Sequence, residues 1–200
     1  MPFFGRKPEV HGSIEYLGLT GWWLKEFSSA ERESMAIIAP TLVEGKIDWT
    51  SATAAMTLNG LSSYLYKTPA DRKLALRLLA KAAECAITSK EWEDLHFAYQ
   101  SMITVYYRDR ETDPAALPAA IQACEQQIPI ASKVRAVMER RYPESPLPGH
   151  AGYNQLRIIR KKQGDLAAAI RVCEQAAAQG WNNRGADWAA RYKAKIKNAG

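Results

Sequence analysis

The chain has 200 residues, of which 47% are apolar and 24% charged, a composition typical of a single globular domain. No apolar run approaches the roughly 20 residues of a membrane span, and the N-terminus lacks the apolar stretch of a signal peptide, so we expect a cytoplasmic protein that binds no membrane. The net charge of +6 is uneven, since residues 1–100 carry −1 and residues 101–200 carry +7, which favours an acidic partner.

The first 45 residues are rich in aromatic side chains and glycine. Phe3 and Phe4 precede a cluster of Trp22, Trp23 and Phe27, and nearby glycines allow tight reversals of the chain. Apolar bulk at one end of a helical stack is typical of a cap that covers exposed core. We therefore expect residues 1–45 to fold back as an N-terminal aromatic cap, in one domain with residues 46–200. A ligand-stacking surface made by the two tryptophans is the alternative.

Helix start and stop signals recur along the whole chain, whereas strand signals are missing. The signals are side chains that cap helix N-termini, and prolines and glycines that open or close helices. No run shows the two-residue alternation of a half-buried strand, so the predicted fold class is all-α. The signals are Ser28 with Glu31, Thr68-Pro69-Ala70-Asp71, Ser89 before a helix at 90–110, Asp113-Pro114 before the next helix, and Gly164-Asp165 between two helices.

An eight-residue segment occurs twice, 49 positions apart. Ala119–Gln126 reappears as Ala168–Gln175, with six of the eight residues identical. Such self-similarity is typical of stacked helical hairpins, in which neighbouring copies bury each other's apolar faces. Cys124 and Cys173 occupy equivalent places in the two copies, so we expect both to be small buried packing residues. With Cys85 they form an odd set without a C-x-x-C pair, and neither a disulfide nor a zinc site is expected.

The C-terminal unit, at about residues 150–180, resembles a tetratricopeptide repeat. That family pairs two antiparallel helices, with bulky residues spaced along the first and small residues along the second. The matching residues are Tyr153 and Leu156 on the first helix, Gly164-Asp165 at the turn, and Ala169, Cys173 and Ala176 on the second. Arg157, Arg160 and Trp181 depart from the family pattern, which is typical of a last or divergent repeat.

Two earlier units follow the same pattern, at about residues 92–128 and 55–85. The residues that match are Tyr99, Met102, Ile103 and Tyr106 before Ala120, Cys124 and Gln127, and then Leu58, Leu61, Ser62 and Leu65 before Ala75, Leu79 and Ala82. The resemblance implies a tetratricopeptide-like α-α superhelix of stacked hairpins over residues 46–200. The whole chain also resembles a bacterial group of such repeat proteins that has no known activity, so this second resemblance implies none.

Two stretches lie outside the repeated units. Residues 131–142 have a helical pattern, and the prolines of Pro143–Gly149 then force an extended connection. At the C-terminus, Trp188, Tyr192 and Ile196 recur at four-residue spacing, which predicts a capping helix over residues 186–198 with a basic outer face.

In tetratricopeptide arrays the first helices of successive units line a concave groove that commonly holds an extended peptide. The matching positions here carry an amide early in each helix and a cation near its end, which can pair with a peptide backbone and with carboxylates. These positions are Asn59, Tyr66 and Lys67; Gln100, Tyr107 and Arg108; and Asn154, Lys161 and Lys162. We therefore predict a non-enzymatic scaffold that binds an acidic or extended peptide. The alternative is that these cations only stabilise helix C-termini.

Two further functions stay open on the sequence alone. Nucleic acid is the second candidate partner, through basic residues of the C-terminal half, and an enzyme of unknown chemistry is the third reading, through His96, Gln100 and Tyr107 on one helix face. Phosphate-loop, metal-ligand and nucleophile motifs are missing, so we expect no catalytic residue, no metal and no cofactor. We expect a monomer with a protein or peptide partner. The basic residues are Arg157, Arg160, Lys161, Lys162, Arg191, Lys193, Lys195 and Lys197.

Overall fold

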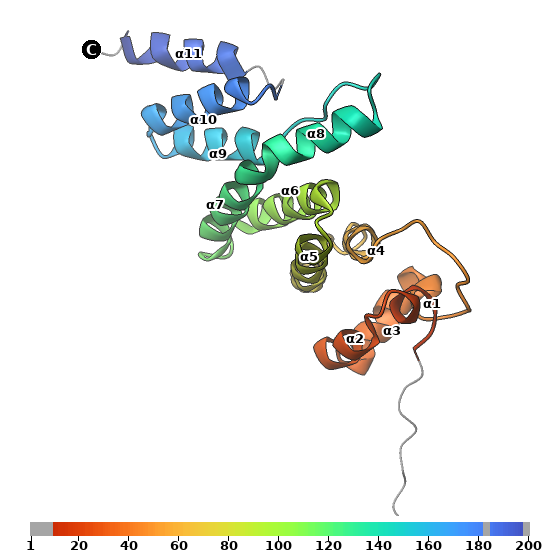
Figure 1. Cartoon of the computed structure of the whole chain (residues 1–200). Coiled ribbons are helices and arrows are strands. Elements are labelled where there is room, and N and C mark those ends of the chain that lie inside the picture. Colours follow the sequence, from red (N-terminus) through yellow and green to blue (C-terminus); the bar gives the residue numbers. More distant parts are fainter. Residues whose placement is uncertain (1–9, 182–184, 198–200) are drawn as a thin grey trace, which may run out of the picture.

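The computed structural model of the chain describes residues 10–181 and 185–197 (Figure 1). Every regular element in these ranges is a helix, which confirms the predicted all-α class, and none of these helices is long and apolar enough to cross a lipid bilayer. The elements are α1 (Gly12–Tyr16), α2 (Thr20–Glu26), α3 (Ser29–Ile38), η1 (Pro40–Leu42), α4 (Ala54–Ser62), α5 (Pro69–Ser89), α6 (Trp92–Asp109), α7 (Ala116–Gln127), η2 (Ile128–Ile130), α8 (Ala131–Arg141), α9 (Ala151–Lys162), α10 (Leu166–Ala178) and α11 (Gly185–Lys197).

Side-chain caps begin several helices where the sequence predicts them. Ser28 and Glu31 form a capping box at α3, Thr68 and Asp71 form another at α5, and Asp165 accepts a hydrogen bond from the backbone of Ala168 at α10. Each cap provides partners for backbone N–H groups that the first helical turn leaves unbonded, and is worth about 1 kcal/mol.

Two of the predicted helix starts are wrong. Ser89 is the last residue of α5, and Lys90, in the left-handed conformation at φ 59°, ends that helix before α6 begins after Glu91. Asp113 does not open α7; its side chain instead caps a turn by accepting a hydrogen bond from Ala115 N at 2.9 Å. In both places a backbone reversal between two helices occupies residues that resemble a helix N-terminus.

Helical hairpins stack in the order of the sequence (Figure 1). The hairpin partners are α4 with α5, α6 with α7, and α9 with α10. Their first helices, α4, α6 and α9, contact one another in turn, while α5 packs on α6 and α7 packs on α9. Each hairpin therefore buries its apolar face against the next one along the chain.

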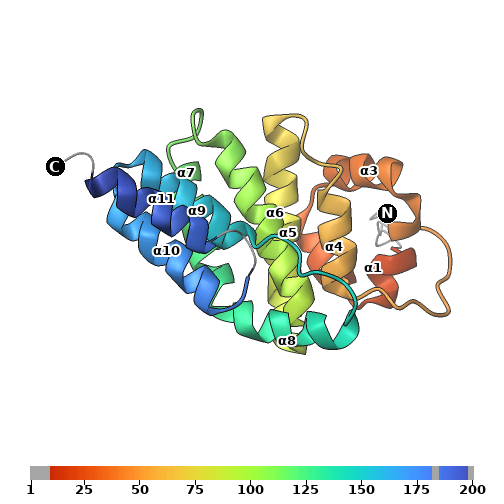
Figure 2. The same ribbon diagram turned by 90° about the horizontal axis from the view of Figure 1, so that it is seen from above.

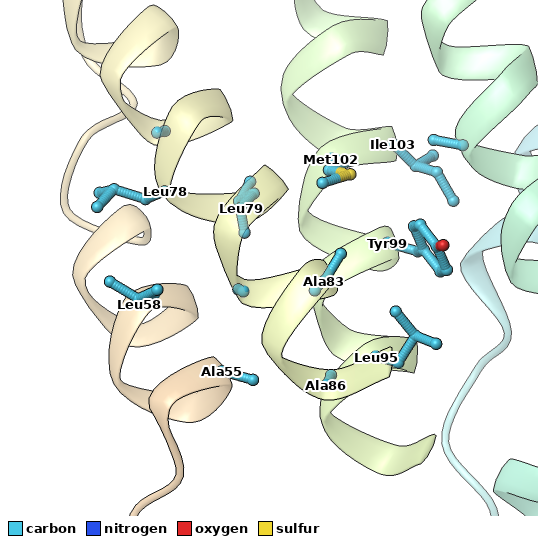
Figure 3. Packing of buried hydrophobic residues seen from close by; sticks show 14 of the residues in the cluster. Ala55, Leu58, Leu78, Leu79, Ala83, Ala86, Leu95, Tyr99, Met102 and Ile103 are labelled. Carbon is cyan, nitrogen blue, oxygen red and sulfur yellow. The ribbon is translucent and has the colours of Figure 1, made fainter. Parts of the chain in front are cut away.

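The core between these helices alternates large and small side chains. Leu58 of α4 meets Leu78 of α5, and Leu79 and Ala83 of α5 lie toward α6, while Tyr99 of α6 points to the other side, away from α5 (Figure 3). Leu58, Leu78 and Leu79 are fully buried, and full burial of such a side chain contributes roughly 1.5–3 kcal/mol. Small residues on α5 let the neighbouring helices approach closely.

The repeated segment lies in the core in both of its copies. Ala120 and Ala169 are fully buried, and Cys124 and Cys173 are at most 2% exposed, so the predicted packing role of the two cysteines is confirmed. Burial raises the pKa of the Cys124 thiol to about 12 and also raises the pKa of Cys173. A thiol in such a site stays protonated near neutral pH and behaves as a small apolar group.

The N-terminal block, formed by α1 to α3, packs against α5. Arg77 of α5 forms ion pairs with Glu26 at 2.7 Å and Glu31 at 2.6 Å, and its guanidinium lies 4.4 Å from the ring centre of Phe27. Trp23 and Phe27 belong to the same buried cluster as α4 to α6, which agrees with the expected fold-back. Because the Trp23 ring is fully buried, the two tryptophans do not form an open ligand-stacking surface. Phe3 and Phe4 lie outside the described residues.

Helix α8 and the segment after it cross the stack rather than extend it. Arg141, at the end of α8, pairs with Glu93 of α6 at 2.6 Å, and residues 143–149 then run back toward α9 (Figure 2). At the C-terminus α11 covers α10, with Tyr192 buried and Trp188 half-buried. Ile196 was expected to be part of this cover, but it is 46% exposed and does not belong to the buried cluster between α10 and α11.

Candidate peptide-binding face

The predicted groove residues lie on or just after the three first helices, α4, α6 and α9. Six of them stand near the C-terminal ends of these helices, and four of the six pair across the boundaries between units. Tyr66 lies 5.9 Å from the guanidinium of Arg108, measured to the ring centre, and Tyr107 lies 5.7 Å from the ammonium of Lys162. The tyrosine of one unit thus meets the cation of the next, twice in succession. A cation over an aromatic ring at this distance gains about 0.5–1 kcal/mol at an exposed site.

Arg72 holds the first of these pairs in place, a role that the sequence gives no sign of. It is only 8% exposed, its Nε donates to Asp109 at 2.8 Å, and its Nη1 donates to the carbonyl of Tyr66 at 3.1 Å. The hydrogen bond from Arg72 lowers the pKa of the Asp109 carboxyl. One guanidinium therefore joins the loop that carries Tyr66 to the end of α6 that carries Arg108.

A pocket of about 230 Å³ lies beside Tyr107, between α6, α7 and α9. Arg110 stands over the Tyr107 ring at 4.2 Å, and the Tyr107 hydroxyl is buried without a hydrogen-bond partner among the described residues. Leu117 and Ile159 form the apolar part of the wall. The sequence did not single out Arg110, which turns back over the ring because its Nη1 donates to the Tyr107 carbonyl at 2.7 Å.

Tyr66, Arg108, Tyr107 and Lys162 form a row of tyrosine and cation pairs. The three predicted amides do not join this row. Asn59 lines a different pocket, of about 240 Å³, together with Glu93 and Arg141, toward the start of α6. Its Oδ1 is buried and has no hydrogen-bond partner within the described part of the chain. Gln100 and Asn154 are half-buried, and Lys67 and Lys161 are exposed to solvent. The structure thus brings tyrosines and cations together, and leaves the amides apart from them.

His96, proposed for catalysis, lies in a closed cluster of side chains. It is fully buried, Gln127 Nε2 contacts its Nδ1 at 3.3 Å and donates to its carbonyl at 2.8 Å, and its ring stacks on Trp181 at 5.5 Å. His150 lies 5.0 Å from it, edge to face. Burial lowers the pKa of His96 to about 4 and that of His150 to about 3, so both rings are neutral near pH 7. This cluster connects His96 to α7 and α9 rather than to Gln100 and Tyr107.

Part of the basic stripe proposed for nucleic acid is already engaged within the protein. Arg157 donates to the Tyr192 hydroxyl at 2.7 Å, Arg160 pairs with Glu125 at 3.2 Å, and Lys193 pairs with Glu174 at 2.6 Å. Arg191 lies over Trp188, while Lys161, Lys162, Lys195 and Lys197 are exposed. Two of these eight cations, Arg160 and Lys193, are therefore paired with carboxylates of the chain itself.

Comparisons with protein-family models, with curated proteins and with solved structures found no match to this chain. Within residues 10–181 and 185–197 there is also no group of three or more histidine, cysteine or acidic side chains placed to hold a metal ion. The geometry of the chain's own side chains is accordingly the basis for the proposals that follow.

Proposed function

We propose that this protein is a non-enzymatic interaction module that binds an extended acidic peptide across the C-terminal ends of α4, α6 and α9. The observation that carries the proposal is the repeated pairing of a tyrosine in one unit with a cation in the next, Tyr66 with Arg108 and Tyr107 with Lys162. A repeated binding element along stacked units suits an extended ligand, because successive ligand residues meet equivalent side chains.

We also propose that the stack is a tetratricopeptide-like superhelix, because its contacts follow the order expected for that family. The first helices α4, α6 and α9 touch in turn, and α5 and α7 each pack on their own first helix and on the following one. The two buried cysteines stand at equivalent places in the second helices α7 and α10. A superhelix of this kind would present the first helices along one inner face.

The chemistry of the row favours carboxylates. Arg108 and Lys162 are exposed and each rests on a tyrosine ring, so their donor groups remain available to a ligand. Exposed ion pairs contribute only about 0.2–1 kcal/mol each, so several must act together. The pocket beside Tyr107 can add apolar contact for one ligand side chain next to an acidic one.

The test is selection from a displayed library of random peptides. The wild-type chain should enrich peptides rich in Asp and Glu, and their binding should weaken as salt is raised, because exposed charges are screened. The double variant R108E/K162E should lose this enrichment. The control is K25E/R171E, which makes the same charge change at exposed residues of α2 and α10, away from the row.

Enrichment of the same acidic peptides by the R108E/K162E chain would refute the proposed row. Equal loss in the control variant would show that net charge alone attracts the peptides. The nucleic-acid alternative is checked separately by gel shift at about 50 mM salt, where phosphate contacts are strong. A shift there that survives R108E/K162E would favour that alternative.

A further inference from the structure

The pocket beside Tyr107 has an apolar wall that the core of the protein leaves out. Leu117 of α7 is half-buried and Ile159 of α9 is 2% exposed, and both line the pocket. Among the described residues, neither side chain belongs to the main core cluster or to the small cluster between α10 and α11. The pocket therefore lies at a break in the apolar core, where the second unit meets the third.

The rim of this pocket carries an excess of positive charge. Arg110 and Lys162 both lie on it, together with the acidic Glu111. Arg110 Nε pairs with Glu111 Oε1 at 3.1 Å, so these two charges offset each other. Within residues 10–181 and 185–197 no carboxylate pairs with Lys162, which contacts the Tyr107 ring. Lys162 is thus available to a carboxylate of a ligand that enters the pocket.

The size of the pocket suits one side chain. Its volume is about 230 Å³, which is below the roughly 300–1,000 Å³ of pockets that enclose a whole small-molecule ligand. Gln163 completes the wall, and its Oε1 already accepts a hydrogen bond from Arg160 at 3.2 Å. A large apolar side chain can fill the space by contacting Leu117, Ile159 and the Tyr107 ring.

The distance between pocket and cation matches the repeat of an extended peptide. Side chains two positions apart point to the same face of such a peptide, and they are about 6.6 Å apart along it. The Lys162 ammonium is 5.7 Å from the centre of the Tyr107 ring, which forms one wall of the pocket. A side chain in the pocket and a carboxylate on Lys162 therefore correspond to two residues on one peptide face.

We infer that the pocket beside Tyr107 is the subsite that selects among acidic peptides. It takes a large apolar side chain that stands two positions from an Asp or Glu, and that acid pairs with Lys162. Leu117 is the specificity-determining residue, because it forms the α7 side of the pocket and is free of both core clusters. The inference rests on the proposed function, since the row must first hold an acidic peptide.

The apolar contact selects because the charges alone do not discriminate. Each exposed ion pair contributes little, and any peptide with several acids can form a few of them. Full burial of a leucine side chain is worth about tenfold or more in affinity. A pocket that holds a single side chain therefore distinguishes peptides that carry the same charge.

The test uses the full-length chain and three fluorescein-labelled peptides, measured by fluorescence anisotropy. The first, Gly-Glu-Glu-Ser-Leu-Ser-Glu-Glu-Gly, has glutamates two positions before and after its leucine, so either chain direction can bind. The second replaces this leucine by alanine. The third, Gly-Glu-Ser-Glu-Leu-Glu-Ser-Glu-Gly, has the composition of the first but places its glutamates on the face opposite the leucine. The wild-type chain should bind the first about tenfold tighter than either of the others.

Tryptophan in place of Leu117 fills the pocket from the side of the protein. L117W should bind the leucine and alanine peptides within about twofold of each other, and both should still bind more weakly as salt is raised. The control L17W makes the same exchange at a half-buried leucine of the N-terminal block and should keep the wild-type preference. The conservative variant L117M should keep most of this preference as well.

Equal binding of the leucine and alanine peptides by the wild-type chain, with both lost in R108E/K162E, would overturn the subsite and leave the acidic-peptide row standing. Tight binding of the third peptide would overturn the two-residue spacing. A leucine preference that persists in L117W would overturn the role of Leu117. If no peptide binds the wild-type chain at low salt, the row is refuted and the subsite with it. If circular dichroism shows L117W to be unfolded, L117A replaces it, and the preference should then fall below about threefold.

Discussion

The two copies of the repeated segment lie in helices α7 and α10, and they are used differently. Their alanines and cysteines are buried alike. Three residues beyond each cysteine the copies diverge, since Gln127 ends α7 and Ala176 takes the equivalent place in α10. Gln127 is fully buried and polar, whereas Ala176 is buried and apolar.

Gln127 connects three helices through hydrogen bonds, whereas the side chain of Ala176 only packs in the main core. The Gln127 amide donates to the His96 carbonyl at 2.8 Å and accepts from Gly152 N at 2.6 Å, so α6, α7 and the start of α9 meet there. A Cβ on Gly152 would lie 2.8 Å from the Gln127 Oε1 and 3.1 Å from the Cys124 carbonyl, so a side chain there would force the Gln127 amide to shift. The carbonyl of Ala176 instead accepts from Trp181 N. Helix α7 also packs against α9, and the Gln127 amide joins the two at the start of α9.

Replacing Trp181 should cause the largest loss of stability, because this residue packs from the end of α10 against His96 of α6 and His150 at the start of α9. It is 1% exposed, and its ring stands 4.8 Å from His150 as well as stacking on His96. Truncation of a buried tryptophan to alanine costs about 3–5 kcal/mol. Urea denaturation of W181A should show this loss, while W188A, at a half-buried site on α11, should lose about 1 kcal/mol. Equal losses in W181A and W188A would mean that the contacts of Trp181 with His96 and His150 add no stability.

Substitution of Gln127 by alanine makes the first copy resemble the second. The change leaves the Gly152 N–H buried without its partner, which costs about 1–3 kcal/mol, and it also removes the hydrogen bond to the His96 carbonyl, which keeps its place in the α6 backbone ladder. We expect Q127A to lower the free energy of unfolding by about 3 kcal/mol, measured by urea denaturation. The neighbouring exposed Gln126 is the control, and Q126A should change it by less than about 0.5 kcal/mol. A small effect of Q127A would show that the amide is dispensable.

Acid should destabilise the fold through His96 of α6 and His150 at the start of α9. Their folded-state pKa values, about 4 and about 3, lie below the ordinary 6.5, so the unfolded chain takes up protons first as the pH falls. Stability is therefore fully present above about pH 6.5 and is lost as the pH falls toward 4. Between pH 7 and 5 each histidine should remove about 2 kcal/mol of unfolding free energy. The lowered pKa values of Glu31 and Asp109 matter only below this interval.

The measurement is the free energy of unfolding by urea at a series of pH values from 7 to 5. The variant H96L removes one of the two titrating rings and should lose about half of the pH dependence. An unchanged slope in H96L would contradict the assignment of the acid effect to this cluster.

The cysteines should show the smallest difference between the copies. Cys124 belongs to the main core, whereas Cys173 belongs to the small cluster between α10 and α11. Replacing a buried thiol by a hydroxyl introduces a polar group that lacks a partner. We expect C124S to cost about 2 kcal/mol and C173S about 1 kcal/mol, measured by thermal melting and urea denaturation. A larger loss of stability in C173S than in C124S would mean that Cys173, rather than Cys124, lies in the more tightly packed part of the core.

Local patterns in the sequence predicted the helices and the burial of the cysteines because these depend on neighbours a few residues away. The caps at Ser28 and Thr68 are of this kind. By contrast, the connection through Arg72 and the return of Trp181 to His96 depend on which distant segments meet, and nothing near either residue signals this.

The candidate site was predicted only in part for the same reason. Residue type at a repeated position predicted the tyrosines and cations, and the structure pairs four of them. The same reasoning treated Asn59 and Gln100 as part of one row, because it took no account of α8, whose end lies beside Asn59 and whose flank covers Phe97.

Helix α8 has a consequence for how the molecule unfolds. In a simple solenoid each unit contacts only its neighbours, so the array can fray one unit at a time from its ends. Here the end of α8 reaches α6 through Arg141 and Glu93, and Tyr142 lies beside Asn59 of α4. A segment inserted between the second and third units thus cross-links the first two. Amide hydrogen exchange in α4, α6 and α9 should accordingly proceed as one cooperative unit, with α11 opening independently at lower free energy.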